Sequence, residues 1–304
     1  MPLITLPPAS QLAAKIKEEL PGFAVVQWLD QVDSTNSQLI NRARQAGPEP
    51  AQARPVVLGA YHQTQGKGRG GRAWKDLDKT TLMFSCAFDV DMPATQLPML
   101  APLCGIVVCE QLRLLVGRAN EHRLSMKWPN DILFDGAKLS GLLVEAVKPA
   151  VGRFSAHHHV VVIGMGLNLS HAKALSESLQ RPVADWTSVL SSLEDRESKA
   201  AANVSGMVAL IANAWYQAIL QYQKTGFEPF VARHAEVDAL KRQTVDVLNG
   251  QTLMFSGQAE GVDKNACLLV RTEEGLKQVI YGDISVRAVD ATAAEEVSGA
   301  SVND

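Results

Sequence analysis

Apolar residues recur at helical and strand spacings along the first half of the chain. They recur every four positions over residues 10–20, which predicts an amphipathic helix. Further helices are expected over residues 33–46, which open on the N-cap-rich sequence Asp-Ser-Thr-Asn, and over the apolar residues 98–116. Apolar and β-branched runs predict strands at residues 23–29, 56–61 and 81–88.

The second half of the chain changes character near residue 240. A strand is expected immediately before Pro129, and the turn Asp135-Gly136 predicts a hairpin between two short strands. Helical spacing dominates residues 186–234. After Val245, short β-prone runs alternate with turn sequences, which predicts a β-barrel of about 45 residues. The strands before this barrel are expected at residues 124–128, 132–134, 139–145 and 160–168.

This order of elements indicates an α+β protein, because it contains hairpins rather than a strict alternation of strands and helices. The change of pattern also indicates two domains. We expect residues 1–240 to form the larger domain, residues 241–290 the barrel, and residues 291–304 a frayed tail.

The composition is that of an ordinary globular protein. Of the 304 residues, 46% are hydrophobic and 20% are charged, and the net charge of −3 argues against a protein that coats nucleic acid. The chain has no apolar run of about 18 residues and no secretory signal at its start, so we expect a cytosolic protein without a membrane span. Its four cysteines include no Cys-x-x-Cys pair, which predicts reduced, partly buried thiols.

The segment from Gly66 to Arg72 holds four glycines and three cationic residues. Glycine lets the backbone approach a ligand closely, and backbone N–H groups with fixed cations bind phosphate. A solvated turn is an equally good interpretation of this segment alone. The dinucleotide fingerprint is disfavoured because a strand is expected next, and a nucleotide-hydrolase phosphate loop fails because Gly68 follows Lys67. An Arg/Gly-rich RNA-binding segment is a further alternative, although such segments are long and disordered.

Three other motifs either place polar groups at the ends of strands or place glycines inside strands. Lys-Trp-Pro-Asn-Asp at residues 127–131 aims a cation beyond an apolar strand, where proline forces a turn. Lys138 precedes a strand that Gly141 interrupts, and such a glycine often marks the close approach of a ligand or another backbone. Gly164 and Gly166 clear one face of a buried strand. Each motif also has a plain structural interpretation: a capped strand end, a solvated hairpin lysine and a bulged core strand.

Together, in this order and spacing, the four motifs resemble those of biotin–protein ligases, and the resemblance extends from about Asp33 to about Arg287. It implies a mixed central sheet with flanking helices, similar to class II aminoacyl-tRNA synthetases, followed by a small SH3-like β-barrel. It also implies an enzyme that makes biotinyl-5′-AMP from biotin and ATP, with Mg²⁺ on the pyrophosphate. Biotin then passes to a lysine of the biotin carboxyl carrier domain of acetyl-CoA carboxylase or a similar biotin-dependent carboxylase.

The resemblance also implies roles for individual residues. It assigns no dedicated metal ligand, but Asp131 is a candidate to orient the acceptor lysine or a metal. The expected catalytic residues are Lys138, Arg69, Lys127 and Asp131. The expected biotin-binding residues are Ser34, Thr35, Asn36, Gln63, Lys67, Gly68, Arg69, Lys138, Gly141 and Leu143. The expected nucleotide-binding residues are Arg69, Arg72, Trp74, Asn168, Trp186 and Arg287.

The implied chemistry brings two anions together when the biotin carboxylate attacks the α-phosphorus, and Arg69 and Lys138 are expected to offset their repulsion. A lysine amine then attacks the acyl carbon and AMP leaves, so no cysteine is required. Many members of the family carry arginine where Lys67 and Gly70 stand, so this loop has fewer guanidinium groups.

Two other functions fit parts of the sequence. A lipoate–protein ligase would share the architecture, and a non-catalytic RNA-binding module would need an extended basic surface. About 30 residues precede Asp33, too few for the DNA-binding domain of some family members, so we expect no sequence-specific DNA binding. We also expect no membrane partner and either a monomer or a homodimer. The consecutive histidines 157–159 are expected in a solvated loop.

Overall fold

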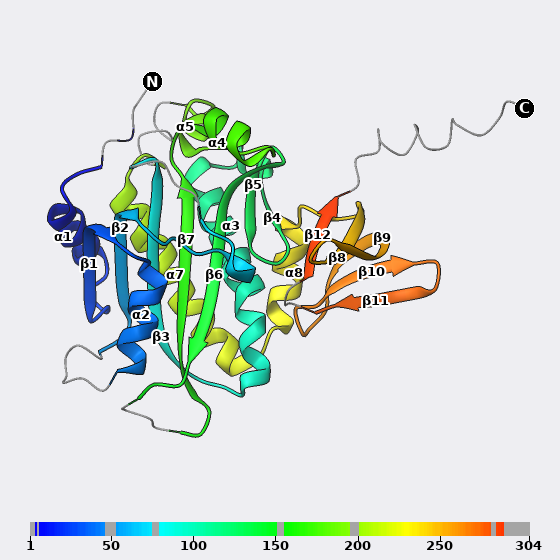
Figure 1. Cartoon of the computed structure of the whole chain (residues 1–304), viewed down its shortest axis with the longest axis horizontal. Helices are drawn as coiled ribbons and strands as arrows, with labels where there is room; N and C mark the ends of the chain where they lie inside the picture. The colour runs from blue at the N-terminus through cyan, green and yellow to red at the C-terminus, as the bar shows by residue number, and fades with distance from the viewer. Residues whose placement is uncertain are drawn as a thin grey trace, which may run out of the picture.

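The computed structural model contains a seven-stranded and a five-stranded β-sheet, with helices on both faces of the larger one (Figure 1). It describes residues 4, 6–45, 53–74, 79–150, 155–194, 201–280 and 284–288. The expected α+β class, with a mixed central sheet and a small C-terminal β unit, is confirmed.

The larger sheet has the strand order β1-β2-β3-β7-β6-β5-β4. β1 and β2 are parallel, and the other neighbouring strands are antiparallel, so the sheet is mixed. The strands are β1 (Val25–Val32), β2 (Val56–Gln63), β3 (Thr81–Asp91), β4 (Leu124–Lys127), β5 (Asp131–Phe134), β6 (Ala137–Val147) and β7 (His158–Asn168).

The helices pack around this sheet. Short 3₁₀ turns lie at η1 (Arg69–Gly71), η2 (Ala94–Met99) and η3 (Glu121–Arg123). The α-helices are α1 (Ala9–Glu19), α2 (Thr35–Arg44), α3 (Leu100–Val116), α4 (Ala172–Leu179), α5 (Trp186–Leu190), α7 (Val204–Thr225) and α8 (Glu228–Val237).

Alternation along β7 divides the core into two layers. Val161 and Ile163 face the larger apolar cluster, which includes residues of α1, α3 and α7. Val160 and Val162 face the opposite way, toward Leu39 and its neighbours on α2. Successive side chains of a strand point to opposite faces, so one strand serves both layers. Figure 1 shows α2 on one face of the sheet, and α3 and α7 on the other.

The apolar helix α3 belongs to this core. By length and composition alone, the stretch Ala94–Val116 could cross a membrane, but 67% of its apolar window is buried inside the protein. α3 packs against α7, and a β-carbon at Gly105 would lie 2.7 Å from Cε of Met126. Burial among helices and strands therefore explains why so few polar residues occur in α3.

The hairpin predicted at Asp135-Gly136 joins β5 to β6. Both residues have positive φ, 48° for Asp135 and 78° for Gly136. This left-handed conformation is typical of a two-residue turn whose twist matches that of the flanking strands. The turn therefore fixes the position of Lys138, one residue beyond the start of β6.

The five-stranded sheet is antiparallel, with the order β11-β10-β9-β8-β12. It touches the larger part of the molecule through Trp128, whose indole N–H donates to the carbonyl oxygen of Ala266 at 3.0 Å. Its strands are β8 (Thr244–Asn249), β9 (Thr252–Val262), β10 (Leu268–Thr272), β11 (Gly275–Val279) and β12 (Ile284–Ala288).

One expectation about local structure is wrong, and one helix was not predicted. His158 and His159 begin β7 and are buried, not solvated, because Nε2 of His158 lies 2.7 Å from Oδ1 of Asp89 on the neighbouring strand β3. Helix α4 lies in a region for which no helix was expected. The tail expected at residues 291–304 lies outside the described residues.

The burial of three cysteines leads to a prediction about alkylation of the four thiols. Cys86, Cys104 and Cys109 are fully buried, and burial raises the pKa of each thiol, that of Cys109 to about 12. Only Cys267, which is half-buried, should react with iodoacetamide in the native protein, whereas all four should react in urea. Mass spectrometry of peptides checks this. Labelling of native Cys104 as fast as Cys267 would contradict the packing described.

Candidate active site

A cavity of about 880 Å³ lies over the larger sheet, on the face that α2 partly covers. Its volume is in the range of small-molecule sites, roughly 300–1,000 Å³. All of the expected catalytic and biotin-binding residues lie on its wall. The wall is formed by residues of α2, β2, β3, β4, β5, β6, β7, α4 and β12, by the loop over residues 66–74, and by the residues that follow β4 and α4.

Glycines keep the sheet bare beneath the cavity. Gly141 of β6 and Gly166 of β7 are opposite each other in register, and Leu143 is opposite Gly164. A β-carbon on Gly166 would lie 2.5 Å from Cε2 of Trp74, and one on Gly141 would lie 3.1 Å from Cζ3 of the same ring. The close approach predicted for Gly141 is therefore confirmed, and the Trp74 indole lies against both Gly141 and Gly166.

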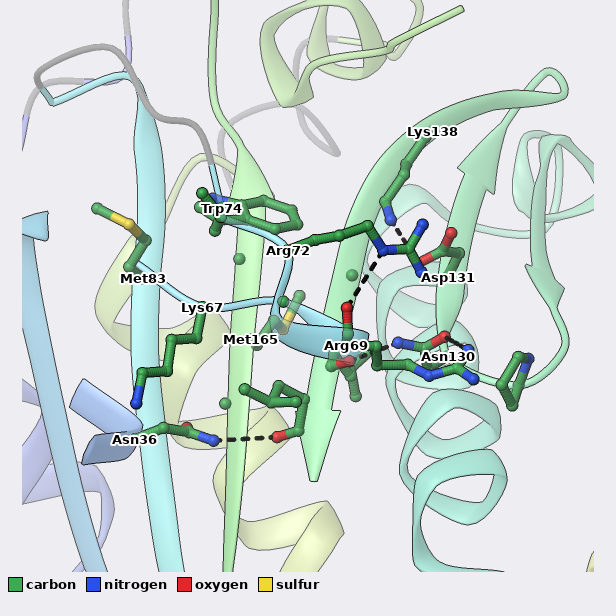
Figure 2. A pocket seen from close by; sticks show the side chains of 18 of the residues that line it. Asn36, Lys67, Arg69, Arg72, Trp74, Met83, Asn130, Asp131, Lys138 and Met165 are labelled. Carbon is green, nitrogen blue, oxygen red and sulfur yellow. Dashed lines mark hydrogen bonds and ion pairs between the residues drawn. The ribbon is translucent and has the colours of Figure 1, made fainter. Parts of the chain in front are cut away.

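The basic loop folds back on itself above this bare surface. The Gly68 N–H donates to the Arg72 carbonyl at 2.7 Å, and the Trp74 N–H donates to the Gly66 carbonyl at 2.9 Å. Gly70, at the tip, has a φ of 61°, which other residues rarely adopt. The turn places the side chains of Arg69 and Arg72 over the cavity, as Figure 2 shows.

The Lys-Trp-Pro-Asn-Asp motif forms one end of the cavity. Asn130 accepts a hydrogen bond from Nη1 of Arg69 at 3.1 Å and donates its amide N–H to the Leu142 carbonyl at 2.5 Å. Asp131 pairs with Lys138, their Oδ1 and Nζ atoms lying 2.5 Å apart. Asn130 therefore links the basic loop to the sheet, and Asp131 holds the hairpin lysine beside it.

Positive charge dominates the cavity wall. Asp131 is the single carboxylate among the described residues that line it. Figure 2 shows Lys67 near Asn36 at one end and Lys138 near Asp131 at the other, with the side chains of Arg69 and Arg72 reaching toward Asn130 and Asp131. Such an arrangement favours an anionic ligand that extends from end to end. The cationic residues on the wall are Lys67, Arg69, Arg72, Lys127, Lys138 and Arg181.

The end of the cavity near Asn36 also presents uncharged hydrogen-bonding groups beside Lys67. Ser34 caps α2, its hydroxyl accepting from the Ser37 N–H at 3.4 Å. The Thr35 N–H donates to Oε1 of Gln63 at 2.7 Å. Beside them, the Gln38 amide and then the Ser34 N–H lower the pKa of Asp33. An uncharged polar ring would find both donors and acceptors here.

Two expected nucleotide contacts are not brought to the cavity. Trp186 is 0% exposed and donates its indole N–H to the Ala201 carbonyl, so its ring has no free face on which adenine could stack. Asn168 is not part of the cavity wall, and it donates to the carbonyls of Lys138 and Ala184, at 3.3 and 3.1 Å. Arg287 lies in β12, and its side chain is outside the described residues.

The wall also contains residues that no motif indicated. Met83 could have been inferred, because it pairs with Gly166 in register across β3 and β7. Val286 comes from the C-terminal sheet, more than a hundred residues beyond β7, and local patterns carry no signal for such a contact. The further residues of the wall are Met165, Leu179, Gln180, Arg181 and Val286.

Comparison with known families gives two matches. Residues 28–168 match the biotin/lipoate A/B protein ligase family, and residues 243–287 match the biotin protein ligase C-terminal domain. Together they include most of both sheets.

Individual relatives agree with these matches. The bifunctional ligase/repressor BirA of Escherichia coli (strain K12) is 26% identical over 288 residues, 94% of this chain and 82% of that protein. The biotin–(acetyl-CoA-carboxylase) ligase of Mycobacterium tuberculosis is 33% identical over 152 residues, 50% of this chain and 52% of that protein. A solved biotin protein ligase from Aquifex aeolicus, in complex with biotin and ATP, has a TM-score of 0.63 at 24% identity and covers 87% of this chain and 99% of its own. This structural likeness shows that the fold is shared.

Gly164 offers a direct test of the packing beside the cavity. A β-carbon there would overlap Oδ1 of Asn36, which is held by hydrogen bonds on both sides. We expect Gly164→Ala to lower the free energy of unfolding by about 1–3 kcal/mol, measured by urea denaturation. Gly22→Ala is the control, because a β-carbon at Gly22 meets nothing within 4 Å. Equal stability of the two variants would contradict the packing.

Proposed function

The chain belongs to the biotin/lipoate A/B protein ligase family, and from that membership we propose that it joins biotin to a lysine of a biotin carboxyl carrier protein, using ATP. The observation that carries the proposal is the shared cavity of Arg69 and Lys138, two cations from separate segments that converge over bare sheet. A biotinyl-adenylate combines a neutral ring, an acyl phosphate and a nucleotide. The cavity offers uncharged hydrogen-bonding groups around Thr35 and Gln63, converging cations, and a volume of about 880 Å³.

In the first step, a carboxylate oxygen of biotin attacks the α-phosphorus of ATP, and pyrophosphate leaves. Lys138 lies at the end where that carboxylate would meet the phosphate, and Asp131 holds its ammonium group in place. Arg69 is held by Asn130, so its charge is fixed before the ligand arrives. Fixed charges stabilise a developing negative charge better than groups that must reorganise.

In the second step, a neutral lysine amine of the acceptor attacks the acyl carbon, and AMP leaves. The amine must lose a proton, and Asp131 is the carboxylate on the cavity wall that can accept one or orient the amine. No cysteine takes part in this scheme, which agrees with the complete burial of Cys86, Cys104 and Cys109.

Magnesium fits this site only as a companion of the substrate. Among the described residues, no group of three or more His, Cys, Asp or Glu side chains could hold a metal ion. Mg²⁺ is commonly bound by substrate phosphates with one or two carboxylates, and Asp131 would be the protein ligand. Bound there, it would neutralise charge on the departing pyrophosphate.

Biotin is favoured over lipoate and over RNA. The C-terminal match is to a biotin protein ligase domain, and the uncharged hydrogen-bonding groups around Thr35 and Gln63 suit a urea rather than a dithiolane. RNA binding would need an extended basic surface. Here the cations converge on a cavity in a chain with a net charge of −3.

The remaining assignments extend the same proposal. Residues 1–240 are proposed as the catalytic domain and residues 241–290 as the C-terminal domain. We also propose a cytoplasmic enzyme, monomeric or homodimeric, without a membrane or a specific DNA sequence as partner. The acceptor is proposed to be the carrier domain of acetyl-CoA carboxylase or a similar carboxylase, as the names of the relatives suggest.

Biotin-dependent exchange of pyrophosphate into ATP measures the first step alone. We expect exchange with biotin and none with lipoate. Lys138→Ala and Arg69→Ala should each reduce the exchange rate by about 10²–10³-fold, because each removes a fixed charge at the reacting phosphate. Both should unfold within a few degrees of the wild type, since the Lys138–Asp131 pair is partly exposed, at 18% and 27%.

Lys15→Ala is the matched control, because Lys15 is exposed on α1 and away from the cavity. It should exchange at the wild-type rate. Exchange that needs lipoate instead of biotin would replace the proposed substrate, and full activity of Lys138→Ala would remove that residue from the reaction.

Transfer to an acceptor tests the second half of the proposal. With ATP, biotin and a purified carrier domain of acetyl-CoA carboxylase, the chain should add one biotin to one lysine, seen as a single mass increase. Replacement of that acceptor lysine by arginine should abolish the increase. Exchange without transfer would retain the first step and overturn the proposed acceptor.

A further inference from the structure

A chain of hydrogen bonds runs from Thr35, at one end of the cavity, through Ser85 and Asn36 to Glu145 of β6. Oγ1 of Thr35 lies 2.7 Å from Oγ of Ser85, which donates to Oδ1 of Asn36 at 2.6 Å. The Asn36 amide nitrogen then donates to Oε2 of Glu145 at 2.9 Å. We refer to Thr35, Ser85, Asn36 and Glu145 as the relay. Thr35 and Asn36 line the cavity, whereas Ser85 and Glu145 are not part of its wall.

All hydrogen bonds of the relay donate in the same sense, from Thr35 toward Glu145, and the Glu145 carboxylate determines that sense. The carboxylate of Glu145 only accepts hydrogen bonds, so Asn36 must turn its NH₂ group toward it and its carbonyl oxygen toward Ser85. Ser85 has a single proton, which goes to that carbonyl oxygen. Thr35 must therefore donate in the 2.7 Å contact with Ser85.

This direction determines what Thr35 offers a ligand. Its Oγ1 also lies 3.1 Å from Oε1 of Gln63, but one proton cannot serve both contacts, and the Ser85 contact is shorter. Oε1 of Gln63 already accepts the Thr35 backbone N–H. Two oxygens with free lone pairs thus lie side by side on the cavity wall, an arrangement that suits an N–H group of a ligand.

The sheet leaves room for the relay at one position. Gly164 is opposite Ser85 and opposite Leu143 in register, so all three share the cavity face. A β-carbon on Gly164 would overlap Oδ1 of Asn36 and lie 3.2 Å from Oγ of Ser85. Asn36 also reaches the Leu143 carbonyl, at 3.4 Å, a contact drawn in Figure 2. The backbone is therefore shaped around these side chains.

We propose that Ser85 and Glu145 are positioning residues that fix Thr35 as a hydrogen-bond acceptor and so select a ring that presents an N–H to it. The inference rests on the proposed function, in which that ring is the ureido ring of biotin. Neither residue touches the ligand in this account. Each acts through the direction of a hydrogen bond.

The test compares biotin with two cyclic carbamate analogues, each with a different ureido N–H replaced by oxygen. Isothermal titration calorimetry measures the dissociation constant of each ligand, and desthiobiotin, which keeps both N–H groups, is the ligand control. The wild-type chain should bind one carbamate far more weakly than biotin, because its ring oxygen faces two acceptors.

Ser85→Ala frees the Thr35 hydroxyl to donate either to Oε1 of Gln63, at 3.1 Å, or to a ring oxygen of the ligand. It should weaken biotin binding about tenfold. The affinity for biotin relative to that carbamate should also fall about tenfold, because the Thr35 hydroxyl can now donate a hydrogen bond to the ring oxygen of the carbamate. Ser140→Ala is the matched control. Ser140 is also 0% exposed and donates to the Gly166 carbonyl at 2.7 Å, but it is outside the relay, so the ratio should not change.

Glu145 gives an independent variant, because it is only partly buried. Glu145→Leu removes the carboxylate that accepts from Asn36, and it should lower the affinity ratio of biotin to the carbamate as Ser85→Ala does. Glu145→Gln can still present an oxygen to Asn36 and should restore most of it. In pyrophosphate exchange, Ser85→Ala and Glu145→Leu should raise KM for biotin about tenfold and leave kcat and KM for ATP within about twofold.

The outcomes are distinguishable. A wild-type chain that does not bind biotin would overturn the proposed function, and this inference with it. Normal biotin binding by the wild type, with unchanged ligand ratios in Ser85→Ala and Glu145→Leu, would overturn the relay alone. An equal fall in the affinity ratio of biotin to the carbamate in Ser140→Ala would also overturn the relay, because removal of any buried hydroxyl would then have the same effect.

Discussion

The candidate site depends on a stretch of β-sheet that carries no side chains. On the α2 face of β7, Val160 and Val162 pack beneath the helix, and the next two positions on that face are Gly164 and Gly166. With Gly141 opposite Gly166, these glycines leave backbone against which other groups can pack closely. Asn36 and Trp74 lie directly against these glycines. Larger residues there would close the cavity and displace both the polar end and the basic loop.

Few groups are needed to hold several cations close together on the cavity wall. Cations from the loop, from β4 and from the hairpin would repel one another in a closed space. The protein holds them apart with specific partners, Asn130 for Arg69 and Asp131 for Lys138. Each partner comes from the Lys-Trp-Pro-Asn-Asp segment, so a single turn sets the spacing of two positive groups. The cavity keeps a net positive charge, which an anionic ligand would neutralise.

The sequence predicted the parts of the site that depend on local chemistry. Gly66 to Arg72 and Asp135-Gly136 need particular residues to form their turns, so their positions could be inferred. The errors concern the direction of side chains. Helical spacing did not reveal that Trp186 points into the core. The solvated loop expected for His158 overlooked a partner, Asp89, which lies on a strand 69 residues away in the sequence. Ser85 was missed for the same reason, since its role exists only through contacts made across three elements.

The C-terminal sheet is joined to the same turn that orders the cations. Trp128, between Lys127 and the partners of Arg69 and Lys138, donates its N–H to Ala266 in the link from β9 to β10. Strand β12 brings Val286 to the cavity wall. Beneath the turn, Met126 fills the space above Gly105 of α3. The segment that positions Asn130 and Asp131 is therefore held by a core helix on one side and by the second sheet on the other. Because a hydrogen bond to a buried indole fixes both the ring and its backbone, the small sheet contributes to the geometry of the cations without supplying a charge of its own to the described wall.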